Sequence, residues 1–148
     1  LPERPGTEFD VFRKREEGYR AAMVEAGLGD RIRIFRCREG EAFVDVDIAE
    51  FLDHPQRPAA VFCWSDLHAI PLLNAASERG LNVPEDLKVV GYDNSPSGRL
   101  PIIGLTSIDQ HAASLGGLAA EALLERIGGR TTARHETVEP DLLRRRSF

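Results

Sequence analysis

The sequence predicts an α/β fold with an open, mainly parallel sheet and helices on both faces. Short apolar runs alternate along the chain with segments whose apolar residues recur at the helical period. One of these runs, residues 59–64, is almost continuously apolar, which is typical of a strand covered on both faces, and residues 87–92 predict another buried strand. Alternating strands and helices connect through right-handed crossovers on a parallel sheet.

The bulk composition is that of a soluble globular protein. The chain has 148 residues, one domain's length, with 42% hydrophobic and 29% charged residues. Its longest apolar runs are far shorter than the ~20 residues that a membrane span needs, and no Lys/Arg-led apolar signal segment begins the chain. We therefore expect a cytoplasmic protein without a membrane partner. Because the first residue is Leu1, we expect a piece of a longer protein.

The charge and the cysteines exclude several classes of protein. A formal net charge of −5 argues against a nucleic-acid surface over the whole chain. Arginines cluster in residues 31–38 and 144–146, and we expect both clusters to be solvated or at a dimer rim. Cys37 and Cys63 lack metal-ligand spacing, so we expect buried thiols and no disulfide framework.

The first third of the chain predicts a helix, a strand and a second helix. Asp10 is placed to cap the first helix, and Gly27 to end it. Residues 32–37 alternate between apolar and polar and predict a strand, and residues 44–52 have the apolar spacing of a short helix.

The next two elements are a buried strand at residues 59–64 and a helix that runs towards Gly80. Ser65 or Asp66 can cap this helix. Pro71 is its weak point, because proline has no N–H to bond the carbonyl one turn earlier.

The last part of the chain continues the alternation. Residues 87–92 and 102–108 predict strands, and a leucine- and alanine-rich stripe over residues 114–127 predicts a helix that ends at Gly128.

Polar residues follow the predicted strands, where parallel sheets bind ligands. Glu39 and Gly40 follow the first strand, Ser65 and Asp66 the second, and Asp93 and Asn94 the third. This group is suited to hydrogen-bonding a small polar ligand. The alternative is that Ser65 and Asp66 only cap a helix and Asp93 only begins a turn, and the pattern leaves both open.

The sequence gives no support for an enzyme. It has no GxGxxG, GxxxxGK[ST], GxSxG or HExxH motif, and its histidines are scattered. Cys63 and His68 fall on consecutive elements pointing in different directions, which disfavours a nucleophile and base. Asp93, at a strand end, could also be the phosphoacceptor of a receiver domain. That fold needs an acidic pair after its first strand and a lysine after its last strand, and neither is placed here. We expect no catalytic residue, no cofactor and no metal site.

Five segments, in register from residue 15 to residue 147, resemble motifs of the LacI/GalR family of bacterial transcription regulators. They are residues 15–19 (REEGY), 58–66 (PAAVFCWSD), 80–93 (GLNVPEDLKVVGYD), 105–110 (LTSIDQ) and 140–147 (PDLLRRRS).

The resemblance implies a bilobed, periplasmic-binding-protein-like type I domain that closes around an effector. Residues 1–110 would form part of the C-terminal lobe, residues 111–139 would cross to the N-terminal lobe, and residues 140–148 would return as a closing strand. It also implies a homodimer, a sugar-like or nucleoside effector, and operator DNA bound only through an N-terminal helix-turn-helix.

The resemblance further implies a set of ligand-binding residues. Arg15 would donate charge-assisted hydrogen bonds into the cleft, and Asp93 would accept them from ligand hydroxyls. Ser65 stands where many members have asparagine, and Gln110 lies at the hinge crossing. Phe43 lies beside the position where other members often carry a stacking aromatic.

Two other functions compete with the regulator. An exported or lipid-anchored sugar-binding protein of the same fold would carry a signal peptide upstream in place of the helix-turn-helix. An α/β enzyme would use Asp66 or Asp93 as an acid or base.

Overall fold

The computed structural model describes residues 8–35 and 45–148. The chain divides into two compact units, residues 1–54 and residues 55–148. Within the described ranges we find no helix that combines the length and apolar character needed to span a bilayer.

The first unit contains two helices and a short 3-10 turn. Helix α1 spans Glu8–Glu25, the turn η1 spans Gly29–Arg31, and helix α2 spans Asp45–Asp53. Gly27 has a φ of +71° and ends α1 as predicted. The N–H of Leu28 donates to the carbonyl of Met23 at 2.8 Å, and the N–H of Gly27 donates to that of Val24 at 3.0 Å. This is the paired bonding of a left-handed helix end that favours glycine.

Two predictions for the first unit are wrong. Helix α1 begins at Glu8, so Asp10 lies in its first turn and is not the cap; acidic residues are favoured in a first turn as well. Residues 32–35 form no strand, and residues 36–37 lie outside the described residues. Alternation alone does not make a strand, because the backbone also needs a neighbouring strand to bond. The predicted second helix is confirmed, and the Phe51 ring meets that of Phe35 edge to face at 4.8 Å.

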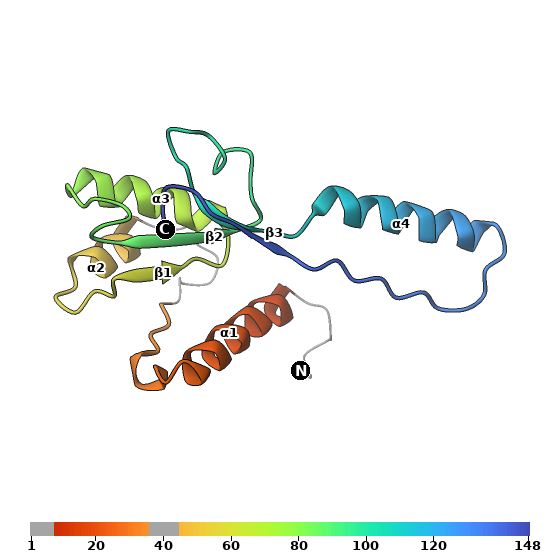
Figure 1. Ribbon diagram of the computed structural model, residues 1–148, viewed down its shortest axis with the longest axis horizontal. Helices are drawn as coiled ribbons and strands as arrows, with labels where there is room; N and C mark the ends of the chain where they lie inside the picture. The colour runs from red at the N-terminus through yellow and green to blue at the C-terminus, as the bar shows by residue number, and fades with distance from the viewer. Residues whose placement is uncertain (1–7, 36–44) are drawn as a thin grey trace. The chain divides into compact units, whose positions relative to one another are not determined.

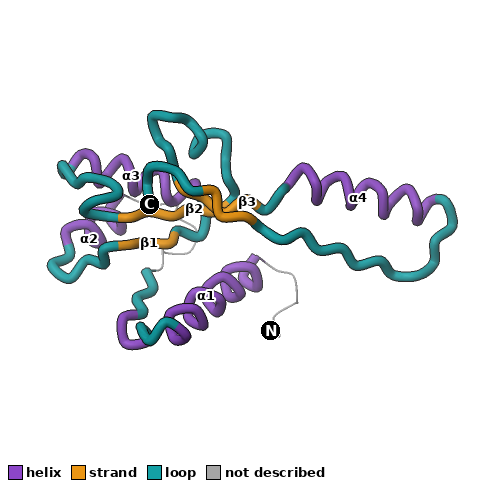
Figure 2. Tube along the Cα trace, viewed as in Figure 1, coloured by secondary structure: helices purple, strands orange, loops and turns teal. Residues whose placement is uncertain are grey.

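The second unit is built on a four-stranded sheet (Figure 1; Figure 2). Its strands lie in the order of the chain: β1 (Ala60–Phe62), β2 (Lys88–Tyr92), β3 (Thr106–Asp109) and β4 (Asp141–Leu143). The first three are parallel, and β4 runs antiparallel to β3. The predicted mainly parallel α/β fold is confirmed. Strand β3 begins later than expected, because residues 101–103 form a turn and Gly104 has a φ of +58°.

Helix α3 spans Asp66–Glu78 and packs against β2. The core of this layer consists of fully or almost fully buried side chains: Ala69, Leu72, Ala76, Leu87, Val89 and Leu105. Each buried leucine contributes about 1.5–3 kcal/mol relative to an exposed one. Pro71 lies inside α3 without ending it. The carbonyl that Pro71 leaves without its usual helical donor belongs to Leu67, in the first turn of α3.

Helix α4 spans Ala112–Ile127 and leads away from the sheet, and the chain returns beside it to β4 (Figure 1). No residue of α4 is buried. The return is fixed by side-chain contacts: Arg134 Nη1 lies 2.7 Å from Glu125 Oε1, and Arg130 Nη2 donates to the carbonyl of Ala122 at 3.0 Å.

Candidate functional site

The polar residues predicted to meet at one edge of the sheet follow neighbouring parallel strands. Ser65 and Asp66 come after β1, Asp93 and Asn94 after β2, and Gln110 directly after β3. Since β1 pairs with β2, and β2 with β3, in parallel, these positions share the carboxyl edge of the sheet.

Asp93 and Gln110, two of the predicted ligand-binding residues, are brought together by the structure. Asp93 is exposed, and its Oδ1 accepts a hydrogen bond of 2.7 Å from Gln110 Nε2. Its backbone has a φ of +100°, and its N–H donates to the carbonyl of Ile108 at 2.9 Å. A carboxylate has about four lone-pair positions, so it can accept further bonds from a polar ligand.

Asp66 has a structural role at this edge. It is 1% exposed; its Oδ2 accepts the N–H of Ser95 at 2.6 Å, and its Oδ1 accepts the hydroxyl of Ser107 at 2.6 Å. It therefore ties the start of α3 to the loop after β2 and to β3. The alternative that Asp66 caps the helix is wrong, because it lies inside the first turn and Ser65 is the cap residue.

Asn94 links the edge to the C-terminal segment. It has a φ of +48°, and its N–H donates to Ser107 Oγ at 3.0 Å. Its Nδ2 donates to Asp109 Oδ2 at 2.9 Å, and its Oδ1 accepts from Arg145 Nη2 at 2.7 Å. The backbone N–H of His111, and then the amide of Asn94, hold the pKa of Asp109 below its ordinary value.

The expectation that residues 144–146 form a solvated cluster is wrong for Arg145. Its side chain is partly buried, and Nη1 donates to the carbonyl of Leu105 at 2.6 Å. Three adjacent arginines look alike in a sequence, but a segment lying across the sheet turns alternate side chains inward. Neither this contact nor the Asn94 network was foreseen, because both depend on segments far apart in the chain.

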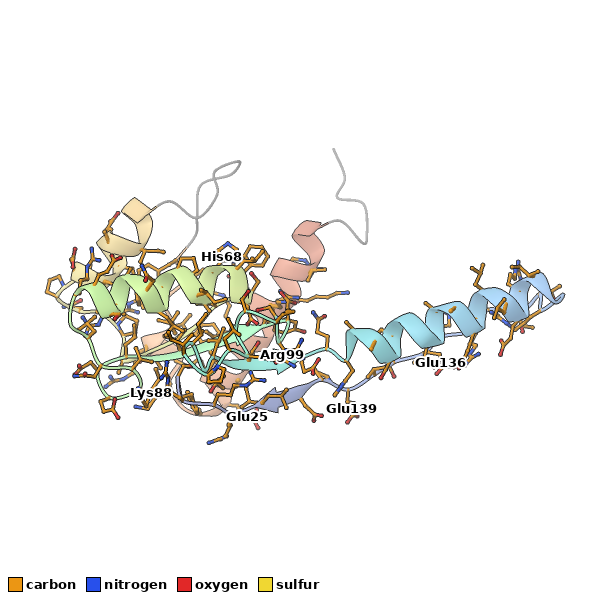
Figure 3. The ribbon with its side chains drawn as sticks, turned by 90° about the horizontal axis from the view of Figure 1, so that it is seen from above. Glu25, His68, Lys88, Arg99, Glu136 and Glu139 are labelled. Atoms are coloured by element: carbon orange, nitrogen blue, oxygen red, sulfur yellow. The ribbon has the colours of Figure 1, made fainter. Side chains whose placement is uncertain are left out.

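Ser65 is 4% exposed, and its Oγ lies 2.9 Å from Nδ1 of His68. The His68 ring lies against the ring of Trp64, with 4.2 Å between centroids and 41° between planes. Burial lowers the pKa of His68 from 6.5 to about 4, so the imidazole is uncharged at neutral pH. His68, in the first turn of α3, is labelled in Figure 3. The sequence signal for this ring contact is the position of Trp64 just before the predicted helix cap and of His68 just after it.

The remaining predicted residues belong to other parts of the chain. Arg15 is in α1, in the first unit, and Phe43 lies outside the described residues, as do Cys37, Glu39 and Gly40. Cys63 is a buried thiol outside any disulfide, as predicted. Among residues 8–35 and 45–148, no group of three or more histidine, cysteine or acidic side chains could hold a metal ion.

Comparison with known proteins gives a consistent set of relatives. Residues 4–148 match the family described as "Periplasmic binding protein-like domain". The HTH-type transcriptional repressor PurR of Actinobacillus pleuropneumoniae is 38% identical over 143 residues, which cover 93% of this chain and 42% of the repressor.

Solved structures agree with the sequence relatives. A LacI transcriptional regulator from a Rhodococcus species has a TM-score of 0.77 and 31% identity, covering 90% of this chain and 49% of that one. The transcriptional regulator CelR in complex with cellobiose has a TM-score of 0.71 and 32% identity, covering 90% of this chain and 42% of that one.

These relatives are transcriptional regulators and not enzymes, and the chain spans less than half the length of each. The matched family covers almost all of the chain, and the motif resemblance, the parallel sheet and the similar structures agree with it. The chain therefore belongs to the periplasmic binding protein-like domain family, in the form that LacI-family transcriptional regulators use as their effector-binding domain.

Proposed function

We propose that this chain senses a small polar effector of the sugar or nucleoside class for a LacI-type DNA-binding regulator. The observation that carries the proposal is the exposed Asp93 carboxylate, held by Gln110 at the carboxyl edge of the sheet. Carboxylates accept charge-assisted hydrogen bonds from hydroxyl and N–H groups, which both ligand classes carry on their rims. The cellobiose complex of CelR, a similar structure, supports the sugar class.

The other binding residues follow the same proposal. Gln110 contacts both Asp93 and the effector, and Ser65 contributes from the start of α3, after β1. Arg15 donates to the effector from α1, and Phe43 contributes an aromatic face. The support for Arg15 and Phe43 is the position that each holds in the matched motifs.

The domain boundaries form a second part of the proposal. Residues 1–110 belong to the C-terminal lobe, residues 111–139 cross to an N-terminal lobe, and residues 140–148 return. Helix α4 supports this division, because it contributes nothing to the core of its own unit. Three of its large apolar residues, Leu123, Leu124 and Ile127, are 60–75% exposed. An N-terminal lobe would cover them.

The mechanism is a shift between lobe orientations. An effector that binds one orientation more tightly increases its population, and a homodimer passes the change to helix-turn-helix segments on operator DNA in the cytoplasm. The apolar residues Leu67, Leu100 and Ile102 are 50–79% exposed and support a dimer contact on this unit.

The test is effector titration of the full-length regulator by calorimetry, using a panel of sugars, nucleosides and sugar phosphates. Asp93→Ala should abolish the effector response and leave operator binding intact. Asp93→Asn, which tolerates the positive φ, removes the charge with the least backbone strain. Glu85→Ala removes an exposed carboxylate at the other end of β2 and should titrate normally. Unchanged titration of both Asp93 variants would refute the assignment.

A further inference from the structure

The chain's single tryptophan lies at the carboxyl end of β1, and the proposed function does not use it. The Trp64 side chain is 38% exposed although its ring also lies against His68. A large aromatic ring that is held in place and still exposed is a common means of binding flat ligands.

The position of Trp64 relative to Asp93 follows from the strand register. Phe62 pairs with Val90, and the N–H of Cys63 donates to the carbonyl of Val90 at 2.8 Å. Continuing this register places Trp64 beside Tyr92, one residue before Asp93. Neighbouring strands lie about 4.8 Å apart, so one six-membered or purine-sized ring can span the two positions.

His68 holds the indole and adds no charge to it. The Ser65 hydroxyl, 2.9 Å from Nδ1, limits rotation of the imidazole, and the imidazole supports one side of the indole. The exposed Asp93 carboxylate at the same edge of the sheet disfavours an anionic ligand, and His68, uncharged at neutral pH because it is buried, adds no positive charge to offset it. The pair suits a neutral ring.

A purely structural role is the competing explanation. Trp64 precedes the cap residue Ser65 and contacts the first turn of α3, an arrangement close to a hydrophobic staple that fixes the entry of the chain into the helix. A staple needs contact with the helix only. It does not require the indole to be exposed at the edge that carries Asp93.

We infer that Trp64, supported by His68, is a stacking platform for the apolar face of a neutral ring whose rim hydroxyls or N–H groups bond Asp93. The inference rests on the proposed function and narrows its ligand class to pyranose sugars and nucleosides, and it disfavours highly charged sugar phosphates. Trp64 thereby determines specificity for ring-shaped ligands.

The test uses Trp64 itself as the reporter. The full-length regulator is titrated with glucose, cellobiose, adenosine and guanosine by calorimetry, and acrylamide quenching of tryptophan emission is measured with each. Where other tryptophans occur in the full-length chain, they are first replaced by phenylalanine. A ligand that stacks should protect Trp64 from acrylamide. Sugars should shift the emission to the blue, whereas nucleosides should quench it.

Three variants complete the experiment. Trp64→Ala should weaken binding roughly fivefold to a hundredfold, the loss typical of one stacked ring. Trp64→Phe should restore most of the affinity. Ser77→Ala, at an exposed position near the other end of α3, should bind as the wild type does.

Each outcome decides the inference. Binding without protection of Trp64, or with unchanged affinity in Trp64→Ala, would show that the indole is only a staple, and the proposed function would stand. If Trp64→Ala fails to fold, protection in the wild type and the affinity of Trp64→Phe decide in its place. If neither the four probes nor any other sugar, nucleoside or sugar phosphate of the panel binds the wild type, the proposed function fails, and the inference fails with it.

Discussion

At the scale of single residues, the Asp66 carboxylate organises the candidate site without facing a ligand. It accepts two short hydrogen bonds in the protein interior, from Ser95 and from Ser107. Gly91 and Gly98 provide the space: a Cβ on Gly91 would lie 2.2 Å from Asp66 Oδ1, and one on Gly98 would lie 3.0 Å from Oδ2. The loop that carries Asp93 and Asn94 is thus held in place by Asp66, the first residue of α3.

Gly91→Ala should destabilise the protein by about 2–4 kcal/mol, because Asp66 or Leu105 must move to make room for the methyl group. The cost should be smaller when Asp66→Ala has already removed the carboxylate, which a double-mutant cycle measured by urea unfolding would show. Gly117→Ala is the matched control, since nothing lies within 4 Å of a Cβ there; it should stabilise α4 by about 0.5–1 kcal/mol. Equal costs of Gly91→Ala in both backgrounds would contradict the contact.

His68 gives a prediction about pH. Its folded pKa is about 4, below the ordinary value of 6.5, so between these values the unfolded chain binds more protons than the folded one. The contribution of neutral His68 to stability is complete above pH 6.5 and is lost as the pH falls towards about 4. The free energy of unfolding should therefore decrease over this window, and His68→Phe should make the decrease smaller.

The control for this prediction is Ser97→Ala, which changes an exposed side chain without a titratable group and should leave the slope unchanged. Asp109, whose pKa is lowered, acts in a different window, because its contribution is lost only as the pH falls below the ordinary carboxyl value of 3.8. An identical pH dependence of the free energy of unfolding in the wild type and in His68→Phe would show that His68 does not cause the decrease.

At the scale of secondary-structure elements, the C-terminal segment completes the sheet at the amino ends of β2 and β3. Ser147 is 1% exposed; its Oγ donates to the carbonyl of Val89 at 2.6 Å and accepts the N–H of Thr106 at 2.8 Å. Its own carbonyl accepts the N–H of Val89 at 2.8 Å. One serine thereby satisfies backbone groups of two neighbouring strands.

Ser147→Ala should cost about 2–4 kcal/mol, because it leaves a buried N–H and a buried carbonyl each without one partner. Urea unfolding measures the loss, and hydrogen exchange should accelerate at Thr106 more than at other positions in β3. Ser97→Ala, at an exposed position in the loop after β2, should change stability by less than about 0.5 kcal/mol. Slow exchange at Thr106 in Ser147→Ala would mean that water or a neighbouring group replaces the hydroxyl.

Strands β1 and β2 could be located from the apolar runs at residues 59–64 and 87–92. The expectation that the first run is covered on both faces is wrong, because Ala60 and Phe62 are exposed in β1, which has a neighbour on one side only in the described sheet. In β2, Val89 and Gly91 are buried and Lys88 is exposed. The strand predicted from the alternation of residues 32–37 is absent at residues 32–35. Alternating apolar and polar residues are compatible with a strand, but a strand also requires a partner strand elsewhere in the chain. At the site, strand order was enough to bring Ser65 and Asp93 to one edge. The bonds of Arg145 to Asn94 and of Gln110 to Asp93 depend on loop conformations with positive φ, which apolar spacing does not encode.

At the scale of the whole molecule, the segment that leaves the sheet after β3 is bonded directly to the candidate site. Gln110 bonds Asp93, and His111, with a φ of +54°, begins the path into α4. His111 Nε2 lies 3.0 Å from Asp141 Oδ2, so the outgoing and returning chains are also joined to each other. A ligand that bonds Asp93 would therefore contact a residue that is bonded to the start of the segment leading into α4.

Gln110→Ala should consequently impair the coupling between effector and operator more than it impairs effector binding. In the full-length regulator we expect effector affinity to fall by less than about tenfold. The effector itself loses only one neutral hydrogen bond, the one to the Gln110 amide. The ratio of operator affinities with and without effector should move close to one, because Asp93 would no longer be bonded to the segment that leads into α4. Calorimetry and operator titrations at fixed salt measure the two quantities separately. Gln56→Ala, an exposed glutamine before β1, is the control and should retain the wild-type ratio. A Gln110→Ala protein with the wild-type ratio of operator affinities would show that lobe orientation is set without this bond.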